Sequence, residues 1–112
     1  EEEIQIGVYG HWHGILESGT LHKSEARDED DTKHICPLQL ETISRCIKLY
    51  SNPGELVLEP FGGIGSEGYV AIEEGRRAVT VELKKAYYDQ LVLNLASATA
   101  GRTLDLFSLE AK

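Results

Sequence analysis

Apolar residues recur along the chain at spacings that predict helices and strands in alternation. Between residues 38 and 49 they return every three or four positions, as on one face of a helix, and Ser-Asn-Pro-Gly at 51–54 ends that pattern. The next apolar run, Leu56 to Leu58, is short and favours a buried strand. We expect the helix to pack against this strand.

A glycine loop follows the strand. Pro60 and the glycines after it prevent either a strand or a helix from continuing. From Ser66 onward, apolar residues reappear at helical spacing. Ser66 can cap this helix, Glu67 lies in its first turn, and Gly75 is expected to end it. The order strand, glycine loop, helix places unpaired helix N–H groups beside backbone that a ligand can approach, so the loop is a candidate ligand site.

A second strand is predicted at Ala78 to Val81, and the acidic Glu82 follows it. In a Rossmann-like fold, a second parallel strand ends beside the first, and a ribose-binding acid lies about twenty residues after the glycine loop. Glu82 has that spacing, which favours a nucleotide-like ligand, although glycine loops also occur in α/β proteins that bind none. The loop lacks the GxGxxG spacing of dinucleotide sites, which disfavours a dehydrogenase-type ligand.

The two ends of the chain are less regular. After Glu82, apolar residues three or four apart predict a covering helix from about residue 84 to residue 98. Gly101 is expected to break it, and residues 103–109 alternate enough to form a short strand or a docked extended segment. Near the start, the alternation over Ile4 to Tyr9 predicts a strand, followed by a loop or hairpin.

The glycine loop also carries a more specific signature. Residues 59–66 read Glu-Pro-Phe-Gly-Gly-Ile-Gly-Ser, which resembles the Asp-Pro-Phe-x-Gly-x-Gly-Thr/Ser signature of the DNA amino-methyltransferases. Residues 34–40, His-Ile-Cys-Pro-Leu-Gln-Leu, and residues 76–83, Arg-Arg-Ala-Val-Thr-Val-Glu-Leu, are similar to the flanking segments in permuted members of that family, phage and prophage-type enzymes above all. Together the resemblance covers residues 34–96.

This resemblance implies a fold and a reaction. The fold is α/β: a partial Rossmann-like, S-adenosylmethionine-dependent methyltransferase fold with parallel strands and covering helices. The family methylates the exocyclic amine of adenine or cytosine in DNA with S-adenosylmethionine, and many members serve restriction-modification systems. S-adenosylmethionine is therefore the implied cofactor.

The resemblance also implies roles for individual residues. Gly63 and Gly65 would let the loop fold under the methionine part of the cofactor, and Glu59, one methylene longer than the family's Asp, would lie near its amino group. Phe61 would pack against the adenine or position a catalytic loop, and Glu82 would accept both ribose hydroxyls. The complete implied cofactor-binding set is His34, Cys36, Pro37, Glu59, Pro60, Phe61, Gly63, Gly65, Ser66 and Glu82.

His34 has two readings of equal weight. It and the backbone from Cys36 to Leu38 resemble positions near the methionine carboxylate. A histidine on the approach to a helix also commonly bonds a neighbouring loop, so its role stays open.

The family's catalytic motif is absent from these residues. That motif is Asp/Asn/Ser-Pro-Pro followed by an aromatic residue, whereas Pro37, Pro53 and Pro60 each stand alone. In permuted enzymes the motif precedes the cofactor segments, so no residue here is predicted to be catalytic. We expect the C-terminal, cofactor-binding part of a DNA methyltransferase. The alternative is a non-catalytic remnant or regulatory module that binds S-adenosylmethionine or a protein partner.

Length and charge restrict what the chain does alone. Its 112 residues make one domain at most, with an acidic segment over 1–33 and the cofactor-binding portion over 34–112. The net charge of −8, from 19 acidic and 11 basic residues, predicts weak DNA binding unless the full-length enzyme supplies it. A sheet this narrow should leave apolar surface that docks on the missing catalytic half or on another copy.

Other classes of protein are disfavoured. No apolar run approaches the roughly eighteen residues of a membrane span and no signal-peptide pattern is visible, so we expect a cytoplasmic protein of a bacterium or phage-infected host. Cys36 and Cys46 lack suitably spaced histidines and are predicted to be reduced thiols, with Cys46 on the apolar helix face. His11 and His13 are not expected to bind metal, and Trp12 is expected to pack under a loop.

Overall fold

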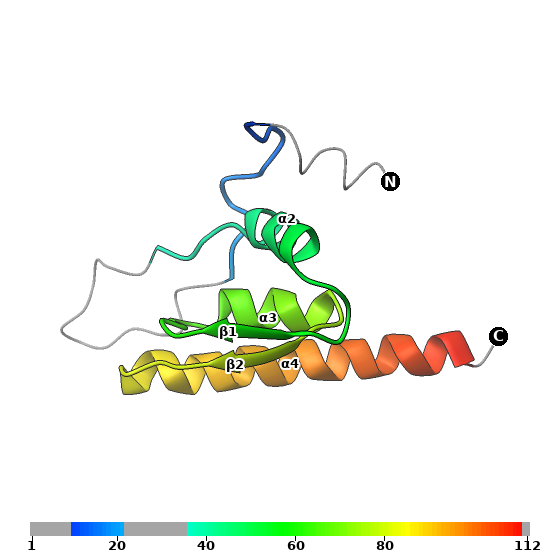
Figure 1. Ribbon diagram of the computed structural model, residues 1–112. Helices are drawn as coiled ribbons and strands as arrows, with labels where there is room; N and C mark the ends of the chain where they lie inside the picture. The colour runs from blue at the N-terminus through cyan, green and yellow to red at the C-terminus, as the bar shows by residue number, and fades with distance from the viewer. Residues whose placement is uncertain (1–9, 22–35, 111–112) are drawn as a thin grey trace.

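The computed structural model describes residues 10–21 and 36–110, without the side chains of 104–110. The strand expected over 4–9 and His34 lie outside the described residues. The elements, in chain order, are α2 (Leu40–Tyr50), β1 (Leu56–Glu59), α3 (Ser66–Glu73), β2 (Arg77–Thr80) and α4 (Lys85–Glu110), as Figure 1 shows.

The two strands form a parallel sheet joined by the crossover helix α3. Leu56 pairs with Arg77 and Glu59 with Thr80, so the carboxyl ends of both strands meet at one edge. The ladder continues one step further, because the Val81 N–H donates to the Glu59 carbonyl over 2.8 Å. The predicted strands and their parallel direction are confirmed, and so is the α/β class.

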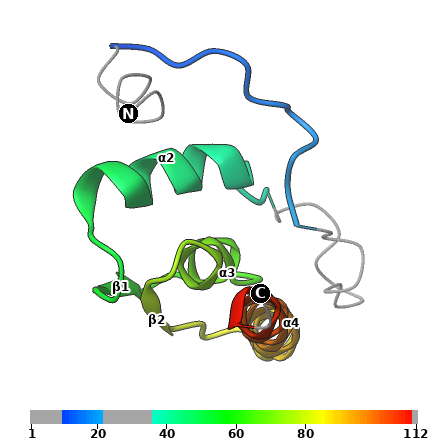
Figure 2. The ribbon, with the colours of Figure 1, turned by 90° about the vertical axis from the view of Figure 1, so that its right-hand side faces the viewer.

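Helix α3 is the central element. Figure 2 shows it between α2 and α4, with the sheet at its side. Ile43 and Ile47 of α2 meet Val70 and Ala71 of α3 in a core where each is less than a tenth exposed. The expectation that α2 packs directly on β1 is wrong: α2 contacts α3, and β1 reaches the same cluster only through the side chain of Val57.

The two ends of α3 are made differently from one another. Its N-cap is Gly65, at φ 90°, and Ser66 is already the first helical residue, so the prediction of a Ser66 cap is wrong. At the other end, Gly75 takes φ 78° and donates to the Ile72 carbonyl at 3.0 Å. A helix end of this kind needs a residue that tolerates the left-handed conformation, and glycine does so most readily. The prediction that Gly75 ends the helix is therefore confirmed.

Helix α4 continues through Gly101 to residue 110, so the expected break and the expected extended tail are both wrong. A glycine inside a helix costs only about 1 kcal/mol relative to alanine, because it keeps its N–H. Beyond it, the Arg102 side chain donates to the Glu73 carbonyl at 3.1 Å and ties this turn to the end of α3. None of the described helices, α4 included, is both long and apolar enough to cross a membrane.

Along each strand, side chains on one face of the sheet are half-buried and side chains on the other face are exposed. Val57 and Ala78 pack against the core cluster, whereas Leu56, Leu58 and Val79 are 52%, 64% and 46% exposed. The narrow sheet thus leaves apolar surface, as its two strands predict. Docking of this surface on another polypeptide stays a prediction.

Residues 10–21 lie against α2 and place Trp12 beside a cation. The Arg45 guanidinium lies 5.7 Å from the centroid of the half-buried Trp12 ring and also donates to the His13 carbonyl at 3.2 Å. Trp12 therefore has a packing contact in the described part of the chain.

Both cysteines are free thiols, as predicted. The placement of Cys46 on the apolar face of α2 is wrong, because its side chain is exposed. The buried stripe of this helix runs through Ile43, Ser44 and Ile47 instead.

Two helix-interior glycines should respond oppositely to alanine. A Cβ at Gly68 would lie 2.7 Å from Thr80 Cγ2 and 2.8 Å from Leu95 Cδ2, whereas one at Gly101 would have no atom of the described part of the chain within 4 Å. We expect Gly68→Ala to lower stability by about 1–3 kcal/mol through overpacking. Gly101→Ala should raise it by about 0.5–1 kcal/mol through helix propensity.

Thermal unfolding followed by circular dichroism tests this pair. A Tm change of about 4–8 °C accompanies each kcal/mol in a domain of this size. A higher Tm for Gly68→Ala would contradict the tight contact between α3 and its neighbours.

Candidate functional site

The glycine loop between β1 and α3 is held by backbone hydrogen bonds and by α4. The Gly62 N–H donates to the Val81 carbonyl and the Gly65 N–H donates to the Gly62 carbonyl, each with an N···O distance of 2.7 Å. On its other side, the Asn94 amide of α4 donates to the Ile64 carbonyl at 2.7 Å. The loop is therefore in place before any ligand arrives.

Acidic side chains at the carboxyl ends of both strands accept backbone N–H groups of this region. Glu82 Oε2 accepts a hydrogen bond from the backbone N–H of Gly63, and Oε1 accepts one from the backbone N–H of Lys84; each N···O distance is 2.7 Å. Glu59 Oε1 accepts from Phe61 at 2.7 Å. Bonds from N–H groups to a carboxylate are charge-assisted and strong. Glu82 and Glu59 thus position the loop, whatever else they contact.

The two glycines singled out by the sequence have different surroundings. Gly63, at φ 53°, has no described atom within 4 Å of the position that a Cβ would occupy, so a ligand can come close to its backbone. Gly65 is buried, and a Cβ there would lie 3.0 Å from Leu91 Cγ. The missing side chain at Gly65 thus allows contact with α4, and its predicted part in ligand binding is untested.

A hollow of about 240 Å³ lies beside the loop. It brings together the segment at 36–38, the loop and the start of α4, which are far apart in the sequence. Of the predicted cofactor-binding residues, Glu59, Pro60, Gly65 and Glu82 are not among those that line it. The described residues that line it are Cys36, Pro37, Leu38, Phe61, Gly62, Gly63, Ile64, Ser66, Glu67 and Tyr87.

Sequence reasoning missed Glu67 as a lining residue of this hollow. The sequence indicated only that Glu67 lies in the first turn of α3. From that position its side chain also lines the hollow, next to Ser66. Burial raises the pKa of the Glu67 carboxyl above its ordinary value, its own backbone N–H opposes that rise, and the Glu59 carboxylate adds to it.

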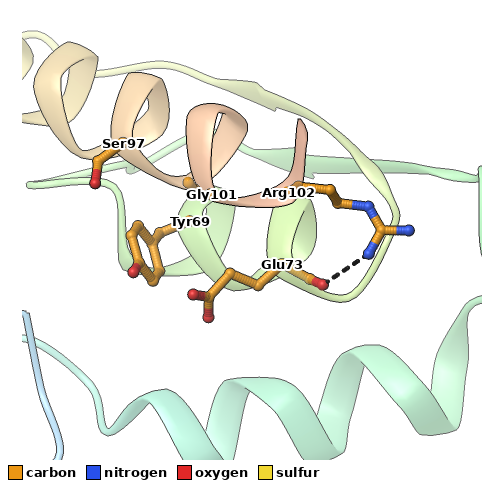
Figure 3. A pocket seen from close by; sticks show the side chains of 6 residues that line it. Tyr69, Glu73, Ser97, Gly101 and Arg102 are labelled. Atoms are coloured by element: carbon orange, nitrogen blue, oxygen red, sulfur yellow. Dashed lines mark hydrogen bonds between the residues drawn. The ribbon is translucent and has the colours of Figure 1, made fainter. Parts of the chain in front are cut away.

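A second hollow, of about 410 Å³, lies between α3 and the middle of α4 (Figure 3). Tyr69 and Glu73 line it from α3, and Ser97 and Arg102 from α4. Burial raises the pKa of the Tyr69 hydroxyl, and a hydrogen bond with Glu73 adds to this. Although this hollow is larger, it contains no predicted site residue and most of its polar side chains are exposed, so the loop hollow is the better candidate site.

No described group of three or more His, Cys, Asp or Glu side chains could hold a metal ion. The described residues of the loop offer hydrogen bonding by backbone N–H groups and carboxylates, next to an apolar wall of Leu38, Phe61 and Ile64. Such a surface suits a ligand that has hydroxyl or ammonium groups on an organic frame.

Comparison with known proteins places this geometry among methylases. Residues 10–93 match a family model described as DNA methylase. The chain is 39% identical over 62 residues to Type II methyltransferase M.Cfr9I of Citrobacter freundii, which covers 55% of the chain and 21% of that protein. It is 34% identical over 86 residues to Type II methyltransferase M1.MboII of Moraxella bovis, covering 74% and 32% respectively.

A solved structure agrees with these sequence matches. The crystal structure of the M1.HpyAVI-SAM complex superposes with a TM-score of 0.54 and 28% identity, over 62% of this chain and 34% of that one. The chain thus spans about a third or less of the length of each of these three proteins.

Asn94→Ala should loosen the glycine loop. The substitution removes the hydrogen bond to the Ile64 carbonyl, which contributes about 0.5–1.5 kcal/mol. We expect amide hydrogen exchange to become about two- to tenfold faster at Gly63 to Gly65. Thr99→Ala is the matched control, because the Thr99 hydroxyl donates to the Leu95 carbonyl of its own helix and to no other described residue. Equal exchange in both variants would show that α4 does not hold the loop.

Proposed function

The chain belongs to the DNA methylase family whose model it matches over residues 10–93, and from this we propose that it forms the cofactor-binding part of a DNA methyltransferase. Its ligand would be S-adenosylmethionine, and its target the exocyclic amine of adenine or cytosine. The resemblance in the sequence and the partial Rossmann-like methyltransferase fold are both confirmed by the matches. The observation that carries the proposal is the glycine loop, tied through Gly63 to Glu82.

The residues present fit S-adenosylmethionine in chemistry. Gly63 leaves its backbone open to a ligand, and the hollow beside it has an apolar wall for an adenine. An ionised carboxylate has about four acceptor positions, so Glu82 retains acceptors beyond the two N–H groups that it already binds. Glu59 and Glu67 supply negative charge near a ligand that has an ammonium group and a sulfonium.

Each part of the chain then has a task in binding. Glu82 would accept the ribose hydroxyls while it holds the loop through Gly63. Phe61, which is 86% exposed, would pack against the adenine or against a catalytic loop. The segment at 36–38 would bound the methionine end. When bound, S-adenosylmethionine supplies the methyl group that the amine of an extruded base attacks.

The site is one wall of a complete enzyme site on this proposal. Enclosed ligand pockets measure roughly 300–1,000 Å³, whereas the hollow here measures about 240 Å³. The apolar sheet face and the net charge of −8 also favour a protein surface over DNA as the direct partner. We propose that the polypeptide with the catalytic Pro-Pro-aromatic motif closes the site and engages the DNA, in the cytoplasm of its host cell.

Glu82→Ala should weaken S-adenosylmethionine binding by about tenfold or more, because charge-assisted hydrogen bonds contribute about 1.5–3 kcal/mol. Isothermal titration calorimetry of the purified chain checks this, with NAD as the negative ligand. Asp89→Asn is the matched control: it also removes one negative charge, but Asp89 is exposed and pairs only with Lys85 among the described residues. Unchanged affinity in Glu82→Ala would refute the ribose role.

Methyl transfer to duplex DNA by this chain alone should be undetectable, since the catalytic motif is not among its residues. A transfer assay with labelled S-adenosylmethionine tests this. Binding of the cofactor without transfer is the expected result. Efficient transfer would contradict the assignment of the chemistry to another polypeptide.

A further inference from the structure

Glu67 has a half-buried side chain beside the glycine loop. It extends from the first turn of α3 and lines the loop hollow with Gly63 and Ser66. None of the ion pairs recorded among the described residues includes it. A carboxylate that loses water without gaining a counter-charge is destabilised. A cation bound in the hollow would offset that loss.

The charged and titratable groups around Glu67 set the sign of the potential in the hollow. Glu59, at the end of β1, lies close enough to raise the Glu67 pKa. Cys36 contributes a thiol and Tyr87 of α4 a phenol. The Lys84 ammonium lies over the Tyr87 ring, 4.7 Å from its centroid. Among the described residues, the lining thus contains a carboxylate and no lysine or arginine, which favours a positively charged ligand.

On the basis of the proposed function, we propose that Glu67 makes the site distinguish S-adenosylmethionine from S-adenosylhomocysteine by the charge on sulfur. The methyl donor has a positive sulfonium, whereas the product that remains after transfer has a neutral thioether. The two ligands share the adenine, the ribose and the amino acid. If a substitution of Glu67 changes the two affinities by different factors, the difference therefore arises from the sulfonium and its methyl group. The preference assists exchange of spent product for fresh donor.

The primary experiment is a calorimetric titration of the full chain with each ligand separately. Glu67→Gln removes the charge and nearly preserves the size of the side chain. It should lower the ratio of the affinity for S-adenosylmethionine to the affinity for S-adenosylhomocysteine about three- to fivefold, mainly through weaker binding of S-adenosylmethionine. This change is about what a partly exposed charge pair contributes. Glu73→Gln is the matched control, because Glu73 is an exposed carboxylate on the same helix that lines the other hollow. It should leave the ratio unchanged.

Proton release gives a second readout. Burial and Glu59 raise the Glu67 pKa, so Glu67 becomes neutral at a higher pH than an ordinary glutamate as the solution is acidified. The preference should be complete above that raised pKa and lost as the pH falls from it through the lower pKa that Glu67 has beside a bound sulfonium. Near it, a bound sulfonium favours the charged carboxylate, so S-adenosylmethionine should release more protons than S-adenosylhomocysteine. Titrations in two buffers of different ionisation enthalpy count these protons, and Glu67→Gln should abolish the difference.

The outcomes separate this proposal from the proposed function. An equal loss of affinity for both ligands in Glu67→Gln would overturn it, because Glu67 would then act on the shared amino acid or on the loop. An unchanged affinity ratio would overturn it as well, while cofactor binding by the unaltered chain would still support the proposed function. If the unaltered chain binds neither ligand, the proposed function fails, and the charge selection fails with it.

Discussion

The structure depends on a contact between the glycine loop and α4 so close that only a hydrogen atom fits in place of a side chain. A Cβ on Gly62 would lie 2.8 Å from Leu91 Cδ1, and one on Gly65 would lie 3.0 Å from Leu91 Cγ. This approach brings Asn94 within hydrogen-bonding distance of the Ile64 carbonyl. The loop is consequently held by the sheet on one side and by a long helix on the other, which makes it rigid enough to preorganise a ligand site.

Carboxylates give the site its second defining property. Glu59 ends β1 and Glu82 lies two residues beyond the end of β2, and each accepts a hydrogen bond of 2.7 Å from a loop N–H group. Their charge thereby contributes to the local fold as well as to any ligand contact. Glu67 differs, because burial and Glu59 raise its pKa and no described cation pairs with it. A positively charged ligand would offset the charge of this carboxylate.

The narrowness of the sheet explains two features of the molecule, the exposed apolar face of the sheet and the small, open hollow beside the glycine loop. With one strand pair among the described residues, α3 covers one face of the sheet and leaves Leu56, Leu58 and Val79 exposed on the other. Parallel strands are ordinarily buried on both faces. The same incompleteness leaves the loop hollow small and open beside Phe61. Membership of the DNA methylase family is consistent with a larger sheet to which these strands would belong.

Local pattern was sufficient for much of the fold. Helical spacing, short apolar runs and the glycine signature predicted the order of the elements, the parallel direction of the strands and the family, because each depends on residues close in sequence or on the resemblance of a short motif to a family signature. Gly75 was predictable for the same reason, since ending a helix is a local event. In the site, the loop and the segment at 36–38 were anticipated from the resemblance, and the structure brings Cys36, Pro37 and Phe61 to one hollow.

What only the tertiary structure decided involves contacts between distant residues. Gly101 looked like a helix end, but the Arg102 contact to α3 and a modest glycine penalty let α4 continue. Cys46 is exposed because the buried stripe of α2 is set by where α3 lies. Glu67 lines the site because α3 starts at Ser66 and turns that side chain toward the hollow. Sequence periodicity specifies which residues share a face, whereas the neighbour against which that face packs is chosen by the whole fold.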